Sequence, residues 1–137
     1  MKLAHVSETF AVSPQLKPSD MRGLADAGFK GVICNRPDGE EPNQPTVASL
    51  QDAAEATGLD FHHIPVSGGE FPPVAIKAFA KIRGEADGKV LAFCRTGTRS
   101  ITLDALANIE NETADERIKR AERAGYDLSG MRDRLSE

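Results

Sequence analysis

Residues 89–100 read KVLAFCRTGTRS, an apolar run that ends in a cysteine and passes into a short polar loop. Apolar runs of roughly four to eight residues bounded by turn residues are typical of buried strands. We therefore predict a strand over 89–94, at the centre of a sheet. A helix is predicted to begin near Arg99 or Ser100, because apolar side chains return at helical spacing at Ile101, Ala105, Leu106 and Ile109.

The rest of the chain repeats this alternation of short apolar runs and helical segments. Further strands are predicted at HVSETF, FAVS, GVICN and DFHHIPV, which are residues 5–10, 10–13, 31–35 and 60–66. Helices are predicted from cap residues, Pro and terminal Gly over 19–28, 46–58 and 72–83. Thr113 and Glu116 have capping-box spacing and begin another helix, which ends at Gly125. The pattern predicts a single three-layer α/β domain, 1–137, around a central, mainly parallel sheet.

The composition is that of an ordinary globular domain. The 137 residues include 39% hydrophobic and 28% charged residues and carry a net charge of -4. Such a chain offers no general basic face, so we expect neither a nucleic-acid nor a membrane partner. Two cysteines are too few for a secreted disulfide scaffold, and no apolar leader is present, so reduced thiols and a cytoplasmic location are expected. No metal or other cofactor is predicted, because His62 and His63 should point to opposite faces of a strand.

The loop CRTGTRS, residues 94–100, has the composition of an anion cradle. Glycine permits tight curvature, and the N–H groups of such a loop and of the following helix point inward toward an anion. We expect a small oxyanion or a phosphate ester to bind there, held by Arg95, Thr96, Gly97, Thr98, Arg99 and Ser100. In this positive environment the pKa of Cys94 should be lowered, and its thiolate is the predicted nucleophile.

The loop has two other interpretations. A cysteine that ends a buried strand is more often a small apolar core residue. However, two arginines, a glycine and hydroxyls directly after Cys94 are poor core material, because charges are rarely buried without partners. The loop could also belong to a binding module that captures an anion or a phosphorylated partner. The cysteine argues for chemistry, since Ser or Ala would bind an oxyanion without the oxidation hazard of a thiolate.

The longest irregular stretch is NRPDGEEPNQP, residues 35–45. Loops at the C-terminal ends of parallel strands meet around one mouth, so Arg36 is a candidate anion ligand and Asp38 a candidate acid. A turn role for Asp38 is equally open. Cys34 is expected to face the core, and a regulatory Cys34–Cys94 disulfide is a further possibility that spacing alone does not decide.

Several segments together resemble a known family. Besides CRTGTRS, residues 10–45, 63–69 (HIPVSGG) and 124–135 (AGYDLSGMRDRL) resemble the phosphatase-like domain of beta-lactamase-hydrolase-like proteins. This resemblance implies a tyrosine-phosphatase-like fold and hydrolysis of phosphate monoesters through a phospho-intermediate on Cys94. Members of this family also occur fused to sulfur-oxidising metallo-hydrolase domains, and relatives have been labelled sulfurtransferases.

The loop departs from the tyrosine-phosphatase pattern in the place of its arginine. Arg99 comes one position early, and Ser100 holds the usual arginine place. In this respect the loop resembles the CRxGxR cradle of rhodaneses, which implies a Cys94 persulfide and sulfur transfer. The sequence therefore leaves phosphoryl and sulfur transfer open, with phosphatase chemistry leading.

A second departure concerns the general acid. In phosphatases with a segment like HIPVSGG, an Asp follows the valine, whereas this chain has Ser67, Gly68 and Gly69. Glu70 and Asp38 are the nearest substitutes by position. An acid is needed only where the leaving group is poor, as an alkoxide is.

Overall fold

Strand β5 (Lys89–Phe93) lies at the centre of a five-stranded sheet with the order β1-β2-β5-β3-β4. The computed structural model describes all 137 residues. β5 pairs in parallel with β2 and β3, β3 pairs in parallel with β4, and β1 runs antiparallel at one edge. The other strands are β1 (Ala4–His5), β2 (Phe10–Ser13), β3 (Phe29–Cys34) and β4 (Asp60–His63). The predicted mainly parallel sheet is confirmed.

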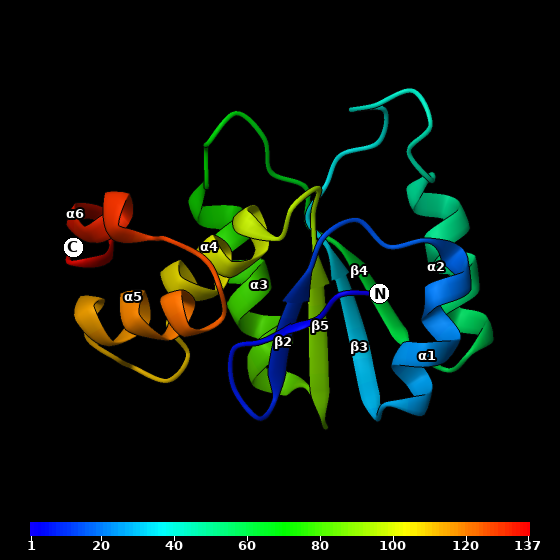
Figure 1. Ribbon diagram of the computed structural model, residues 1–137, viewed down its shortest axis with the longest axis horizontal. Coiled ribbons are helices and arrows are strands. Elements are labelled where there is room, and N and C mark those ends of the chain that lie inside the picture. The colour runs from blue at the N-terminus through cyan, green and yellow to red at the C-terminus, as the bar shows by residue number, and fades with distance from the viewer.

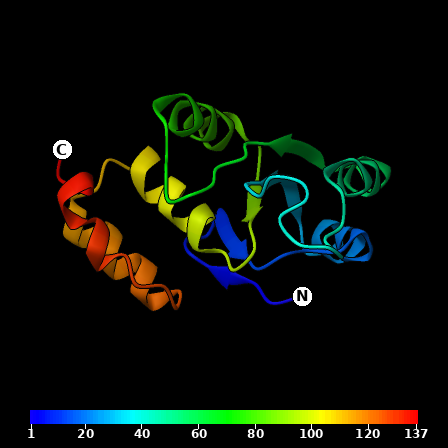
Figure 2. The same ribbon diagram turned by 90° about the horizontal axis from the view of Figure 1, so that it is seen from above.

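Helices cover both faces of this sheet. Helices α1 (Met21–Asp26) and α2 (Val47–Ala56) lie on one face, and α3 (Pro73–Glu85) and α4 (Thr98–Ala107) lie on the other (Figure 1). Seen from above, the last two helices form an additional layer outside α4 (Figure 2); they are α5 (Ala114–Arg123) and α6 (Arg132–Leu135). Short 3-10 turns precede α1 and α6, at Pro18–Asp20 and Ser129–Met131. No helix combines the length and the apolar run needed to span a membrane.

Side chains along β5 alternate between two apolar cores. Val90 and Ala92 belong to the core that contains residues of α3 and α4, and Leu91 and Phe93 belong to the core that contains residues of α1 and α2. A strand with both faces buried reads as a continuous apolar run, because neither face alternates with polar residues. This double burial explains why residues 89–94 identify the centre of the sheet.

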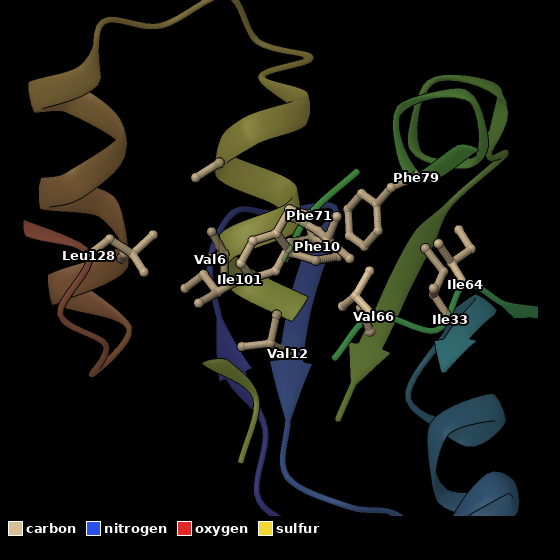
Figure 3. Close-up of a cluster of buried hydrophobic side chains, with 14 of the residues drawn as sticks. Val6, Phe10, Val12, Ile33, Ile64, Val66, Phe71, Phe79, Ile101 and Leu128 are labelled. Carbon is tan, nitrogen blue, oxygen red and sulfur yellow. The ribbon is translucent and has the colours of Figure 1, made fainter. Parts of the chain in front are cut away.

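A buried ion pair joins α4 to the neighbouring helix α3. Arg83 on α3 donates to Asp104 on α4 at 3.0 Å, with both side chains 3% exposed. The Arg83 guanidinium also lies 4.3 Å from the ring centre of Phe10, which meets Phe79 edge to face in the same core (Figure 3). Loss of one member of such a pair typically costs about 3–5 kcal/mol, since the other charge stays buried. The pair therefore anchors the helix that begins at the cysteine loop.

Most predicted helix ends are confirmed, and the clearest is the capping box at Thr113 and Glu116. The first predicted strand is wrong over most of its length. The chain turns after His5, with the N–H groups of Val6 and Ser7 donating to the Phe10 carbonyl, so only two residues pair with β2.

Two helix boundaries also differ from the prediction. Helix α3 continues through Gly84 to Glu85, because glycine disfavours a helix without ending it. Helix α4 begins at Thr98, slightly before the predicted start, because Gly97 serves as its N-cap.

Candidate active site

The carboxyl ends of three parallel strands bring the candidate site together. Cys94 follows β5, Asn35 and Arg36 follow β3, and Gln15 lies just beyond β2. Two backbone hydrogen bonds join these strand ends. The Asn35 N–H donates to the Phe93 carbonyl at 2.8 Å, and the Gln15 N–H donates to the Arg95 carbonyl at 3.3 Å. The crevice beyond the carboxyl ends of the strands is where α/β proteins usually bind ligands.

The cysteine loop curves around the sulfur atom of Cys94. Gly97 has a φ of 95°, a left-handed conformation that favours glycine, and its N–H donates to Cys94 Sγ at 3.1 Å. The first helical hydrogen bond of α4 runs from the Ile101 N–H to the Gly97 carbonyl. The N–H groups of Thr98, Arg99 and Ser100 therefore have no acceptor within the helix. This arrangement has the features of the predicted anion cradle.

Tyr126, from the segment after α5, supports the loop from outside. Its hydroxyl donates to the Thr96 carbonyl at 2.9 Å. A Cβ atom at Gly97 would lie 2.2 Å from the Tyr126 hydroxyl oxygen, far inside contact distance. Glycine is thus required at Gly97 both by the backbone conformation and by the close approach of Tyr126.

The hydroxyl of Ser100 is buried and hydrogen-bonds to a neighbouring side chain. It donates to Asn35 Oδ1 at 2.8 Å, and Asn35 Nδ2 donates in turn to the Ile64 carbonyl at 2.9 Å. Ser100 and Asn35 are both fully buried. These hydrogen bonds fix the first turn of α4 against the ends of β3 and β4, so the Ser100 hydroxyl already has a protein partner.

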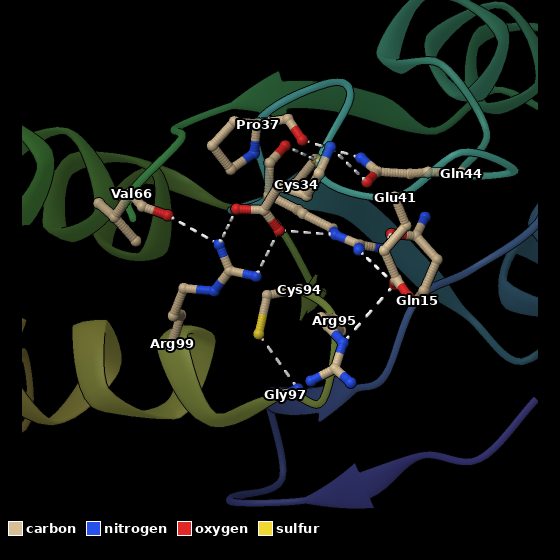
Figure 4. A network of polar contacts seen from close by, with 12 residues as sticks. Gln15, Cys34, Pro37, Glu41, Gln44, Val66, Cys94, Arg95, Gly97 and Arg99 are labelled. Atoms are coloured by element: carbon tan, nitrogen blue, oxygen red, sulfur yellow. Dashed lines mark hydrogen bonds and ion pairs between the residues drawn. The ribbon is translucent and has the colours of Figure 1, made fainter. Parts of the chain in front are cut away.

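Arg99 is held by a carboxylate that the sequence analysis did not single out. Its Nη1 and Nη2 atoms donate to the two oxygens of Glu40, each at 2.8 Å, and Nη1 also donates to the Val66 carbonyl at 2.9 Å (Figure 4). Glu40 accepts a third charged hydrogen bond, from Nε of Arg36 at 2.8 Å. Hydrogen bonds from Arg99 and Arg36 lower the pKa of Glu40 to about 2, so this carboxylate is ionised at neutral pH.

Arg36 is buried beside the Arg99–Glu40 ion pair and is 2% exposed. Its guanidinium donates to Glu40, to Glu41 at 2.5 Å and to Gln15 at 3.0 Å. The predicted role of Arg36 as a direct anion ligand therefore has a competing explanation, because its donors already have protein partners. Arg95 stands at the rim with its side chain 62% exposed and lies 3.6 Å from Glu41.

The two candidate acids occupy other positions. Asp38 accepts a hydrogen bond from the N–H of Val47 at the start of α2, at 2.8 Å. Glu70 is exposed, and its backbone N–H closes a turn to Ser67 at 3.1 Å. The structure records no hydrogen bond or ion pair between either carboxylate and residues 94–100.

Glu40 was missed because DGEEP reads as a solvated, acidic turn. A signal was nevertheless present. An arginine directly after a buried strand needs a nearby counter-charge if it is itself buried, and Glu40 is four residues from Arg36.

The two cysteines have different surroundings. Both are free thiols and buried, and Cys34 packs in the core of α1 and α2, as predicted. Burial raises the pKa of Cys34 to about 11, and its thiol donates to the Arg36 carbonyl at 3.4 Å. Cys94 is 1% exposed, and its sulfur lies within the loop, close to the guanidinium of Arg99 (Figure 4).

Several known proteins are similar to this chain in sequence and in fold. Residues 2–111 match the family model described as "Beta-lactamase hydrolase-like protein, phosphatase-like domain". The chain is 40% identical over 122 residues to the beta-lactamase hydrolase-like protein of Agrobacterium fabrum and 38% identical to that of Xylella fastidiosa strain Temecula1. Each alignment covers 89% of this chain and 27% of the relative, so the chain spans about a quarter of their length.

Solved structures agree with this assignment. A Neisseria meningitidis protein described as a candidate phosphatase is 39% identical, with a TM-score of 0.86 over 98% of this chain and 96% of that one. Tk-PTP in its active form is 20% identical, with a TM-score of 0.74 over 97% and 92% of the two chains, and supports the tyrosine-phosphatase-like fold. The chain therefore belongs to the family of phosphatase-like domains of beta-lactamase hydrolase-like proteins.

Proposed function

We propose that this phosphatase-like domain hydrolyses phosphate monoesters with Cys94 as its nucleophile. The observation that carries the proposal is the convergence of three features on one atom. The N–H of Gly97 donates to Cys94 Sγ, the first turn of α4 faces it with unpaired N–H groups, and Arg99 lies beside it. Positive groups of this kind stabilise a thiolate and the oxygens of a transferring phosphoryl group.

The reaction has two steps. In the first, the thiolate of Cys94 attacks phosphorus, a sulfur–phosphorus bond forms, and the bond to the ester oxygen breaks, so that the leaving group departs with the electron pair. In the second, water attacks the phosphorus of the cysteinyl phosphate. The sulfur–phosphorus bond breaks, the thiolate is restored, and inorganic phosphate and a proton are released.

The hydrogen bonds of Arg99 leave it able to bind the phosphoryl group. A guanidinium has five N–H donors, and Glu40 takes two of them while the Val66 carbonyl takes a third. The donors left are on Nε and on Nη2, at one edge of the planar group. Two neighbouring donors on one edge match two oxygens of a phosphate. Glu40 therefore orients Arg99 without using the donors that the anion needs.

The same geometry restricts the leaving group. Glu40 is the carboxylate that lies at Arg99, and with a pKa of about 2 it carries no proton to give near neutral pH. Asp38 accepts a hydrogen bond from the first N–H of α2, and Glu70 forms no hydrogen bond or ion pair with the cysteine loop. We infer a preference for substrates whose leaving group is stable as an anion, such as aryl phosphates, over alkyl phosphates.

Sulfur transfer is the second candidate, and one observation favours it. Neither Asp38 nor Glu70 forms a hydrogen bond or ion pair with the cysteine loop, and sulfur transfer needs no such acid, because sulfite leaves thiosulfate as a stable anion. Cys94 would take the outer sulfur of thiosulfate as a persulfide and release sulfite. A thiophilic acceptor such as cyanide would then remove that sulfur and restore the thiolate.

Intact mass measurement separates the two reactions. The protein is incubated separately with an activated aryl phosphate and with thiosulfate, and Cys94→Ser is the control. We expect a phosphoryl adduct and release of phosphate on the first, with both absent in the variant. A stable gain of one sulfur from thiosulfate, transferable to cyanide, together with no turnover of any aryl phosphate, would replace phosphatase activity by sulfur transfer.

A further inference from the structure

A hollow of about 440 Å³ lies against the outer side of the cysteine loop. Its wall is formed by the N-terminal segment, by the end of α5 with the residues after it, and by the loop itself. The residues that matter for its chemistry are Lys2, His5, Thr96, Arg123 and Tyr126. Its volume is in the range of small-molecule sites, which is about 300–1,000 Å³.

The hollow is positive in a chain whose net charge is -4. Lys2 and Arg123 line it, His5 adds an imidazole, and no Asp or Glu is among its lining residues. Neither Lys2 nor Arg123 forms an ion pair in the structure, so both charges are free to meet a ligand. The carboxylate of Asp127, close in sequence, accepts a hydrogen bond from the Ser129 N–H at 2.9 Å.

A second hollow, of about 380 Å³, provides a comparison. It lies at the opposite edge of the sheet, beside the first residues of β3 and β4 and the end of α3. Asp60, Glu85 and Asp87 line it together with Lys30 and His62. Of these two hollows, the one that touches the cysteine loop is lined by no carboxylate.

The positive hollow is physically joined to the loop. Thr96 is a member of both, and Tyr126 lines the hollow while its hydroxyl holds the Thr96 carbonyl at 2.9 Å. A ligand bound here would lie directly beside the strand-to-helix turn that carries Cys94. Aliphatic residues and the Tyr126 ring complete the wall, so an organic group with a charged end fits its chemistry.

We propose that this hollow is a second anion subsite, which binds a carboxylate or phosphate group borne by the same substrate whose phosphoryl group reacts at Cys94. The proposal rests on the proposed function for the reacting group, and it adds that the preferred substrates carry more than one anionic group. Arg123 and Lys2 would bind the second group by charge, and His5 by a hydrogen bond.

The first experiment does not depend on turnover. Pyrophosphate is titrated into the full chain, and the His5 ring signals and the amide signals of Arg123 and Tyr126 are followed by NMR. We expect saturable shifts at these residues, weakened in Arg123→Gln and unchanged in Lys119→Gln, which removes an exposed charge from the same helix outside the hollow. Shifts confined to residues 94–100 would overturn the subsite and leave the phosphatase proposal intact.

The second experiment compares two phosphotyrosine peptides that differ only in acidic or neutral residues beside the phosphotyrosine, together with an aryl bisphosphate. We expect Arg123→Gln and Lys2→Gln each to lower kcat/KM about fivefold for the acidic peptide or the bisphosphate, which is the upper range for one exposed charge pair. The neutral peptide should be turned over as by wild type. Equal losses on all three substrates would contradict a subsite, and whichever of the two anionic substrates responds identifies the second group as carboxylate or phosphate.

Discussion

Arg99 and Glu40 form a two-pronged ion pair, in which each guanidinium Nη atom lies 2.8 Å from a different carboxylate oxygen. The pair joins the first turn of α4 to the loop after β3. The same carboxylate accepts a hydrogen bond from Arg36, which is buried with 2% of its surface exposed. Glu41 pairs with Arg36 and Arg95, so two carboxylates face three guanidinium groups in this network. The five side chains together keep one positive charge, which suits an anionic substrate.

Glu40→Gln should lower activity, because it keeps the shape of the side chain and removes the charge that orients Arg99. We expect kcat/KM on an aryl phosphate to fall about tenfold, since misplacement of a transition-state donor is costly. Glu41→Gln is the matched control, because Glu41 is 53% exposed and pairs with Arg36 and Arg95 but not with Arg99. Steady-state kinetics of both variants test this role. A gain in activity in Glu40→Gln would show that the carboxylate competes with substrate instead.

Glu40 should also make stability depend on pH in the acid range. The pKa of Glu40 is lowered to about 2 in the folded protein, whereas an unfolded glutamate titrates near pH 4.3. Its ion pairs therefore stabilise the fold fully above the unfolded pKa, and this contribution is lost as the pH falls toward about 2. Urea unfolding of wild type and Glu40→Gln should converge at the lowest pH. A difference in unfolding free energy that is independent of pH would contradict the ionised pair.

The contact of Tyr126 with Gly97 predicts a coupled pair of variants. Tyr126→Phe removes one hydrogen bond to Thr96 and should cost about 1 kcal/mol of stability, with about a fivefold loss of phosphate affinity as the loop loosens. Gly97→Ala should cost at least about 2 kcal/mol, from its φ of 95° and from the clash with the hydroxyl.

The cost of Gly97→Ala should be smaller in the Tyr126→Phe background. The contact at 2.2 Å is then gone, although the ring carbon at 2.9 Å remains. Denaturant unfolding of the four proteins gives the coupling energy directly. Strict additivity would mean that the two side chains do not meet.

The difference between the two cysteines predicts selective labelling. Since burial raises the pKa of Cys34 to about 11, only about a thousandth of this thiol is ionised at pH 8. Iodoacetamide should label one thiol in the native protein, at Cys94, and both after unfolding. Peptide mass spectrometry assigns the site, and protection of Cys94 by phosphate would place it in the cradle. Faster labelling of Cys34 would contradict the assignment of the nucleophile.

Local patterns determined much of this fold. The run 89–94 predicted the central strand because both of its faces are buried, and Thr113 with Glu116 predicted a helix start because the capping box lies within one turn. The turn from β5 into α4 was predictable as well, because its residues are adjacent in the sequence. Its anion-binding role and the roles of its side chains stay predictions.

Interactions between distant segments could not be predicted in this way. Glu40 lies 59 residues from Arg99 in sequence, and Tyr126 lies 30 residues from Thr96. No spacing rule connects either pair, because packing of the loops and of the last helices decides which side chains meet. Asp38 was predicted as a candidate acid from its place in the loop after β3. In the structure it accepts a hydrogen bond from the first N–H of α2.

The last prediction concerns Asp38 and Glu70, the two substitutes for the missing acid. If either protonated the leaving oxygen, Asp38→Asn with Glu70→Gln would abolish activity on alkyl phosphates and spare aryl phosphates with good leaving groups. The structure instead gives Asp38 a capping bond to Val47 and leaves Glu70 exposed, so neither should matter for chemistry. We expect the double variant to keep the wild-type dependence of kcat/KM on the leaving group.

The two changes should separate in their effect on stability. Asp38→Asn weakens a charged hydrogen bond at the start of α2 and should cost about 0.5–1 kcal/mol, because the amide oxygen still accepts from the Val47 N–H. Glu70→Gln should leave stability unchanged. A series of phosphate esters with graded leaving groups, measured alongside urea unfolding of each single variant, tests both statements. A selective loss on the poorest leaving groups in one single variant would identify that residue as the acid, and the inferred preference for stable leaving anions would then be wrong.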